Sequence, residues 1–344
     1  MKLVLLVHNN LTLQFARKAV EYFQLNPENC LWIRDRRAAV PAEFIHTFDL
    51  DQAPLFEFRI ADALKWGKQI RVNYRSLSRI DRRLSDFAPE GFQLIAPHSY
   101  DLRYHALITH PACEGFYYLE EGKLSCAGNP GGRRNWKRPL VGLGHLFFLK
   151  GRIPAFPPPF STGHPKYKGV FAFSPFAFNG FKNRIELPLP FRRRPELAHF
   201  KQVLVLGPYV EFGELPQEVE TRILKAFFAW FAAESPGRLY VKFHPAQLAQ
   251  DLSSPVIRSL LNEFQGAFSW EEIPPPVSLE EIAVSAQPDM YLATSSVALY
   301  AMASGARVHT YAPDLIKAYP PFRQVWEDLP LTVRNAMSPI PLTQ

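Results

Sequence analysis

The sequence predicts an α/β protein of two Rossmann-like domains that face a central cleft. Short apolar runs, typical of buried parallel strands, alternate with segments of helical periodicity. This alternation occurs twice along a chain of 344 residues, which is long enough for two domains of ordinary size. A proline-rich and charged segment, 151–200, separates the two series.

The first series begins with the apolar run LVLLV at 3–7, which precedes a segment, 11–23, with apolar residues at helical spacing. Asn10 is a suitable N-cap for that helix. Further strands are expected at 30–33, 44–48, 92–97 and 115–122, with helical stretches between them. Strands that alternate with helices in this way form a doubly wound parallel sheet.

The second series begins with the apolar run VLVLGP at 203–208. It continues with helix 216–234, strand 239–243, helices 254–264 and 278–286, a strand–turn–helix unit at 290–305 and a strand at 308–313. We therefore expect an N-terminal domain at 1–190 and a C-terminal domain at 191–313. A helical tail, 314–344, is expected to pack back on the N-terminal domain.

The composition indicates a protein of the cytoplasm. Three cysteines without a CxxC spacing argue against a disulfide framework and a zinc site. The apolar stretch near the N-terminus is too short for a signal peptide, and no run of about 18 apolar residues could span a membrane.

The net charge is +7, and basic residues cluster in RRNWKR at 133–138 and RRR at 192–194. Such clusters are either solvated surface or contacts for an acidic partner, such as anionic lipid headgroups or an anionic glycan. No nucleic-acid-binding signature is present, so we expect no nucleic acid partner. Peripheral contact with the inner membrane stays open.

Three short motifs stand at predicted strand ends, where ligands of such sheets bind. The first is Glu120-Glu121-Gly122. Adjacent residues of a strand point to opposite faces, so only one carboxylate can face the cleft well. In an apolar cleft it can act as a general base, although such a motif is more often a charged turn.

The other two motifs lie in the second series. His244 and Pro245 end the strand that carries Lys242, and a strand-end histidine can donate a proton or a hydrogen bond near neutral pH. Thr294, Ser295 and Ser296 lie between an apolar strand and an apolar helix, where hydroxyls and N–H groups can bind a phosphate. The alternatives are a strand-end cap for His244 and ordinary N-capping for the serines.

The acidic pair, the His-Pro pair and the serine pair, in this order, resemble the motifs of bacterial sialyltransferases of the GT-B fold. These include the polysialyltransferase and lipooligosaccharide-sialyltransferase families. The resemblance implies an inverting glycosyltransferase that moves sialic acid, or a related nonulosonic acid, from a CMP-activated donor to a glycan hydroxyl. It also implies a place in capsule or lipooligosaccharide synthesis, with a glycan or glycolipid acceptor.

The resemblance also implies roles for particular residues. Glu121 would be the base, with Glu120 as the alternative, and His244 would assist the departing phosphate. Ser295 and Ser296, next to Thr294, would hold that phosphate.

Glu280, with Glu281 as competitor, would bind the ribose. Pro245, Lys242 and Gly207 complete the donor-side candidates, and His8, Asn9 and Asn10 could contact donor or acceptor. A CMP-sugar carries a single phosphate, so neither a metal nor another cofactor is expected.

Three alternatives stay open. A CMP-Kdo transferase would share the His-Pro and serine motifs. A UDP-sugar enzyme would normally present a glutamate-rich donor motif that is not evident here. An inactive nucleotide- or glycan-binding protein would keep the fold without turnover. A dinucleotide-binding oxidoreductase is disfavoured, because GLGHLF at 142–147 lacks the third glycine and a preceding strand.

Overall fold

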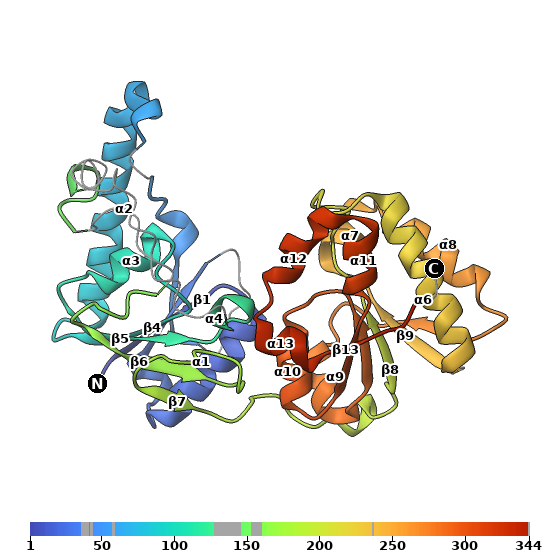
Figure 1. Cartoon of the computed structure of the whole chain (residues 1–344). Coiled ribbons are helices and arrows are strands. Elements are labelled where there is room, and N and C mark those ends of the chain that lie inside the picture. The colour runs from blue at the N-terminus through green and yellow to red at the C-terminus, as the bar shows by residue number, and fades with distance from the viewer. Residues whose placement is uncertain are drawn as a thin grey trace. The chain divides into compact units, whose positions relative to one another are not determined.

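The computed structural model describes residues 1–35, 41, 44–56, 59–126, 146–152, 160–235 and 237–342 (Figure 1). It divides the chain into two compact units, each described by itself. The first holds Met1–Phe173 and Ala177–Pro190, and the second holds Ser174–Phe176 and Phe191–Gln344. The RRNWKR segment lies outside the described residues.

The first unit is built on a parallel sheet of seven strands in the order β3-β2-β1-β4-β5-β6-β7. The strands are β1 (Leu3–Val7), β2 (Cys30–Arg34), β3 (His46–Asp49), β4 (Phe92–Ala96), β5 (Cys113–Leu119), β6 (Tyr167–Ala172) and β7 (Arg184–Glu186). All five residues of β1 are fully buried, as a central strand covered on both faces requires.

Helices cover both faces of this sheet: α2 and α3 lie on one side and α1 on the other (Figure 1). The helices are α1 (Asn10–Tyr22), α2 (Trp66–Phe87), α3 (Leu102–Ile108) and α4 (Lys123–Cys126). Short 3₁₀ turns lie at η1 (Pro27–Asn29), η2 (Leu50–Gln52) and η3 (Ile60–Lys65). Asn9, not Asn10, caps α1, because the Asn9 side chain accepts a hydrogen bond from the Thr12 amide.

The second unit contains a parallel sheet of six strands in the order β10-β9-β8-β11-β12-β13. Its strands are β8 (Gln202–Val205), β9 (Arg238–Lys242), β10 (Ser269–Glu272), β11 (Asp289–Leu292), β12 (Arg307–Thr310) and β13 (Ser338–Pro339). Its helices are α6 (Gln217–Glu234), α7 (Pro245–Gln250), α8 (Ser254–Glu263), α9 (Leu279–Ala286), α10 (Val297–Ala303), α11 (Ala312–Ala318), α12 (Arg323–Glu327) and α13 (Leu331–Ala336), with 3₁₀ turns η4 (Pro195–Leu197) and η5 (Pro320–Phe322).

Residues 314–344 are part of the second unit, which corrects the expectation of a separate tail on the first domain. Strand β13 pairs with β12, so the segment supplies the last strand of the second sheet. Phe322, Ile340 and Leu342 are buried in the same apolar cluster as Leu204 of β8. The segment is held by this burial, which the sequence pattern of LIKAY and RQVWEDL did not reveal.

When each unit is numbered from its own first strand, six strands of both sheets follow the order 3-2-1-4-5-6, and the first sheet adds β7 beside β6. The α/β class and the two Rossmann-like domains are therefore confirmed. In each sheet the order reverses between the first and fourth strands, and ligands of such folds bind beyond the carboxyl ends there. The relevant pairs are β1 with β4 and β8 with β11.

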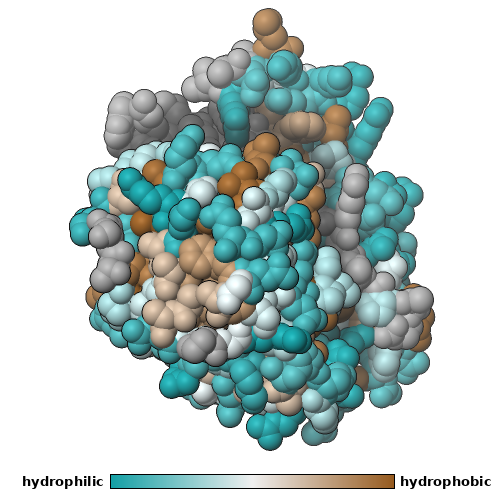
Figure 2. Space-filling view, turned by 90° about the vertical axis from the view of Figure 1, so that its right-hand side faces the viewer, coloured by the Kyte–Doolittle hydropathy of each residue, from teal (hydrophilic) through white to brown (hydrophobic). Residues whose placement is uncertain are grey.

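The described part of the chain holds no helix long and apolar enough to cross a membrane. The face in Figure 2 is largely hydrophilic, with hydrophobic side chains in small groups, as on most water-exposed surfaces.

Glu220 of α6 gives the stability of the second unit a pH dependence. Its side chain is 5% exposed, and burial, reinforced by the charge of Glu211, raises its pKa from 4.5 to about 8. The folded state thus keeps a proton that the unfolded state loses above its lower pKa. The stabilisation is complete below pH about 4.5 and is lost as the pH rises through about 8.

We expect the wild-type free energy of unfolding to fall between pH about 5 and about 9, and Glu220→Gln to flatten this fall, because its amide stays neutral. Urea titrations across the pH range measure it, with exposed Glu218→Gln on the same helix as the control. If the free energy of unfolding of Glu220→Gln falls with pH as steeply as that of the wild type, another group is responsible for the pH dependence.

Candidate active site residues in each unit

In the first unit, three polar side chains meet where neighbouring strands end. His8 follows β1, His98 lies beyond β4 and Glu121 lies beyond β5. Glu121 Oε2 is 3.3 Å from His8 Nε2 and 3.9 Å from His98 Nε2. Each of these side chains is only 9% exposed. The expected strand-end carboxylate thus lies between two histidines, one of which, His98, the sequence motifs did not single out.

The two glutamates of the acidic motif have different environments, as alternation along a strand predicts. Glu120 is fully buried, and its Oε2 accepts a hydrogen bond of 2.5 Å from the Phe173 amide beyond β6. It therefore ties the ends of β5 and β6 together, which leaves Glu121 as the better candidate for the predicted base. Gly122 has φ of +108°, a conformation that L side chains rarely adopt, and turns the chain towards α4.

His98 is held in one orientation by its neighbours. Its Nδ1 accepts a hydrogen bond of 3.2 Å from the Tyr100 amide, so in the neutral ring Nε2 carries the proton. The ring stacks on Tyr104, whose hydroxyl donates to Asp35, the residue after β2. Arg103 Nη1 pairs with Asp35 Oδ1 at 3.0 Å. Through Tyr104, this buried network positions the imidazole that faces Glu121.

The three residues after β1, His8, Asn9 and Asn10, have different environments. His8 contacts Glu121, as described. Asn9 Oδ1 accepts the Thr12 amide at 2.8 Å within a capping box, so the structure gives this side chain a capping role instead of the expected ligand contact. Asn10 is the exposed first residue of α1.

In the second unit, the ends of β9, β8 and β11 carry the expected donor-side residues. His244 lies beyond β9, Gly207 lies beyond β8, and Thr294, Ser295 and Ser296 lie between β11 and α10. These three strands are adjacent in the sheet. The residues therefore flank the place where the strand order reverses.

His244 is the N-cap of α7, with Pro245 as the first helical residue. Its Nδ1 accepts a hydrogen bond of 3.1 Å from the Ala246 amide, which leaves the proton on Nε2. Burial lowers its pKa, and the charge of Glu211 opposes this shift. The ring is therefore a neutral Nε2–H donor at pH 7, which favours hydrogen bonding over proton transfer to a phosphate.

The other two His-Pro pairs adopt the same local geometry. His110 Nδ1 accepts from the Ala112 amide, and His164 Nδ1 accepts from the Lys166 amide, both at 3.1 Å. The dipeptide is thus a local turn, and strand-end position alone distinguishes His244.

Tyr209 connects the two loops that flank the reversal point. Its buried hydroxyl donates to the Thr294 carbonyl at 2.6 Å and accepts from the Thr294 amide at 3.0 Å. A Cβ on Gly207 would come within 2.2 Å of the Tyr209 ring, so this packing requires glycine there. The sequence motifs did not indicate this role, because the partner of Tyr209 is 85 residues away.

The serine pair lies in a short turn. Ser295 Oγ accepts from the Val297 amide at 3.3 Å, which is the expected capping contact. Ser296 precedes α10 without a side-chain capping bond. Thr294 Oγ1 is buried and makes no hydrogen bond with the described residues.

Lys242 has a structural role, which corrects its place among the donor-binding residues. Its ammonium has three donors, and these bond the carbonyls of Pro274, Pro275 and Val277 at 2.7, 3.0 and 3.0 Å. The lysine thereby fixes the loop that leads to α9.

Glu280 is the better ribose candidate of the two glutamates that begin α9. Its Oε2 accepts a hydrogen bond of 2.6 Å from the Ser278 hydroxyl. Glu281 pairs with Arg194 at 3.1 Å and is therefore engaged elsewhere. Arg194 belongs to the RRR cluster and also pairs with Glu196. Among the described residues, no group of three or more His, Cys, Asp or Glu could hold a metal ion.

No protein-family model matches the sequence, and no curated protein matches it. Among solved structures, the glycosyltransferase SnogD from Streptomyces nogalater is 13% identical over 98% of this chain and 96% of its own, with a TM-score of 0.46. MurG from Acinetobacter baumannii is 9% identical over 98% and 96%, with a TM-score of 0.41.

A glycosyltransferase from Rickettsia africae is 9% identical over 98% of this chain and 94% of its own, with a TM-score of 0.43. The sheet order within each unit, and not similarity at this level, carries the assignment of fold class.

We expect Tyr209→Phe to lower the free energy of unfolding by about 1–3 kcal/mol, because a buried amide and a buried carbonyl of Thr294 lose their partner. Urea unfolding measures this change. Tyr240→Phe is the matched control, since Tyr240 is also a buried residue of this unit but its hydroxyl makes no hydrogen bond with the described residues. Equal stability of the two variants would contradict the bridging role.

Proposed function

We propose that this chain is an inverting glycosyltransferase that moves sialic acid, or a related nonulosonic acid, from a CMP-activated donor to a glycan hydroxyl. The single observation that carries the proposal is the position of the motif residues. Glu121 in the first unit, and His244 with Ser295 and Ser296 in the second, lie at strand ends around the two reversal points. Two Rossmann-like domains in one chain are the architecture of GT-B glycosyltransferases.

In this proposal Glu121 accepts the proton of the acceptor hydroxyl. Its carboxylate is 9% exposed, so little water competes with the acceptor for it. His8 and His98 present Nε2 atoms to one of its oxygens. These two contacts orient the carboxylate that would accept the proton of the incoming hydroxyl.

The second unit binds the donor. The departing CMP phosphate gains negative charge on its oxygens, and prepositioned donors stabilise that charge best. The neutral Nε2–H of His244 and the hydroxyls of Ser295 and Ser296 supply such donors, while Glu280 accepts hydrogen bonds from the ribose.

Because CMP-sugars contain one phosphate, we propose that the reaction needs no metal or other cofactor. The acceptor would be a capsule or lipooligosaccharide glycan, and the reaction would take place in the cytoplasm.

The first test is thermal stabilisation of the full-length protein by CMP, UMP, GMP and AMP with EDTA present throughout. We expect CMP to raise the melting temperature selectively, because the second unit would recognise the nucleoside monophosphate released from the donor. Preference for UMP, or no shift with any nucleotide, would overturn the donor assignment. After a CMP shift, turnover of CMP-sialic acid against CMP-Kdo identifies the sugar.

The second test replaces the base. We expect Glu121→Gln to lower kcat by about 10²–10⁴-fold, because the amide cannot accept a proton. Glu120→Gln is the matched control: its amide oxygen still accepts the Phe173 amide, so turnover should be largely retained. Near-wild-type turnover of Glu121→Gln, or an equal loss in both variants, would contradict the assignment.

A further inference from the structure

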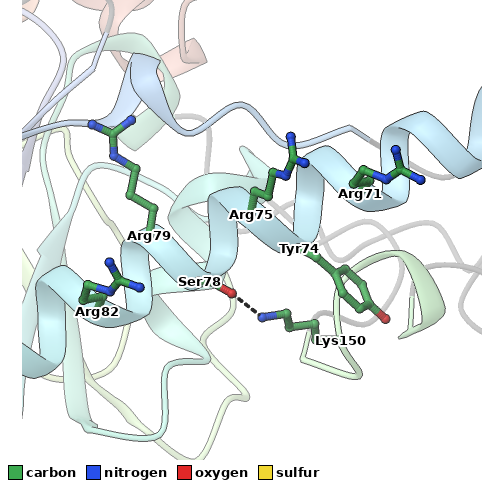
Figure 3. Close-up of a pocket in the computed structure, with 7 residues that line it drawn as sticks. All are labelled: Arg71, Tyr74, Arg75, Ser78, Arg79, Arg82 and Lys150. Carbon is green, nitrogen blue, oxygen red and sulfur yellow. Dashed lines mark hydrogen bonds between the residues drawn. The ribbon is translucent and has the colours of Figure 1, made fainter.

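One face of α2 carries a stripe of arginines that the proposed reaction does not use. Arg71, Arg75, Arg79 and Arg82 are all exposed, and their spacing places them along one side of the helix. They line a pocket of about 540 Å³ together with Tyr74, Ser78 and Lys150 (Figure 3). The pocket lies wholly within the first unit.

The pocket is held together by specific contacts between α2 and the segment 146–152. Lys150 Nζ donates to Ser78 Oγ at 2.7 Å, as the dashed line in Figure 3 marks. Tyr74 donates its hydroxyl to the Phe147 carbonyl at 3.0 Å. Buried Asn73 donates to the Phe148 carbonyl at 3.3 Å. The segment is thus anchored on the helix at three places, and Lys150 is kept beside the arginine stripe.

The charges of this pocket are not compensated within the described residues. Five of the seven lining residues are cationic, and none is acidic. Arg79 donates to Gln52, which is neutral. No ion pair joins Arg71, Arg75 or Arg82 to a carboxylate of the described residues. A surface with this potential attracts a polyanion or an array of phosphates.

Two large apolar side chains of the first unit project into water. Phe147, whose carbonyl bonds Tyr74, is 76% exposed. Leu64 is 105% exposed and lies two residues before the start of α2. In Figure 1, this end of α2 projects furthest from the rest of the first unit. Together with a basic surface, such exposed apolar side chains can enter the interfacial region of a bilayer.

We propose that this face docks on an anionic membrane surface. The arginine pocket takes lipid phosphate headgroups, while Leu64 and Phe147 insert at the boundary of the acyl chains. A nucleic acid would use the arginines but would leave Leu64 without a partner. The inference concerns where the protein works and goes beyond the proposed reaction, because neither Glu121 nor His244 contributes to it.

The test is co-sedimentation of the full-length protein with vesicles. Vesicles of equal parts phosphatidylcholine and phosphatidylglycerol should bind the protein, and vesicles of phosphatidylcholine alone should not. Arg75→Glu/Arg82→Glu should weaken binding by about tenfold or more, since each basic residue near such a surface contributes on the order of a fivefold factor. Leu64→Ser/Phe147→Ser should also weaken binding, at unchanged charge.

Arg222→Glu/Arg323→Glu is the matched control, because it reverses two exposed arginines of the second unit and leaves the pocket intact. It should bind like the wild type, and the melting temperatures of all variants confirm folding. Absence of vesicle binding, or equal losses in the pocket and control variants, overturns the proposal. Binding of a single-stranded oligonucleotide through the same arginines, without vesicle binding, also overturns it. Nucleotide-induced thermal shifts are measured separately, so failure of one proposal leaves the other testable.

Discussion

The structure depends on the complete burial of central parallel strands. Every residue of β1 is fully buried, and most residues of β4 and β8 are buried. A strand covered by helices on both faces has no place for an unpaired charge, because desolvation would cost several kcal/mol. Polar residues are therefore confined to the strand ends, and the strand order decides which of them meet. This constraint places His8, His98 and Glu121 together and determines the neighbours of His244.

Two of the histidines at these edges show how backbone contacts can set chemistry. In His98 and His244, Nδ1 accepts an amide two residues further along the chain, so in the neutral ring Nε2 carries the proton. A single main-chain contact thus selects the tautomer before any ligand arrives. His110 and His164 have the same contact away from these edges. The local turn keeps the proton on Nε2 of the histidine. The position of that histidine in the sheet then decides which groups its Nε2–H can reach.

Sequence patterns predicted the fold well, because buried strands and amphipathic helices follow from local periodicity. They also singled out Glu121, His244 and the serine turn, which adjoin apolar runs; the structure places these residues at strand ends, and their roles stay predictions. His98 was missed because it meets Glu121 only when β4 lies beside β5, and local sequence patterns do not determine the strand order. The role of Tyr209 was missed and that of Lys242 was misjudged, because their partners, Thr294 and the 274–277 loop, are distant in sequence. Pairing of β13 with β12 escaped prediction because two residues carry no usable periodicity.

The pairing of β13 has a consequence for synthesis of the chain. The core of the second unit combines Leu204 with Ile340 and Leu342, so it cannot close until nearly the last described residues have left the ribosome. Almost all of the first unit, by contrast, is complete by Pro190 and can fold while the rest is still being translated. Until β13 pairs, the β12 edge of the second sheet is unpaired, and an unpaired edge can pair with another chain.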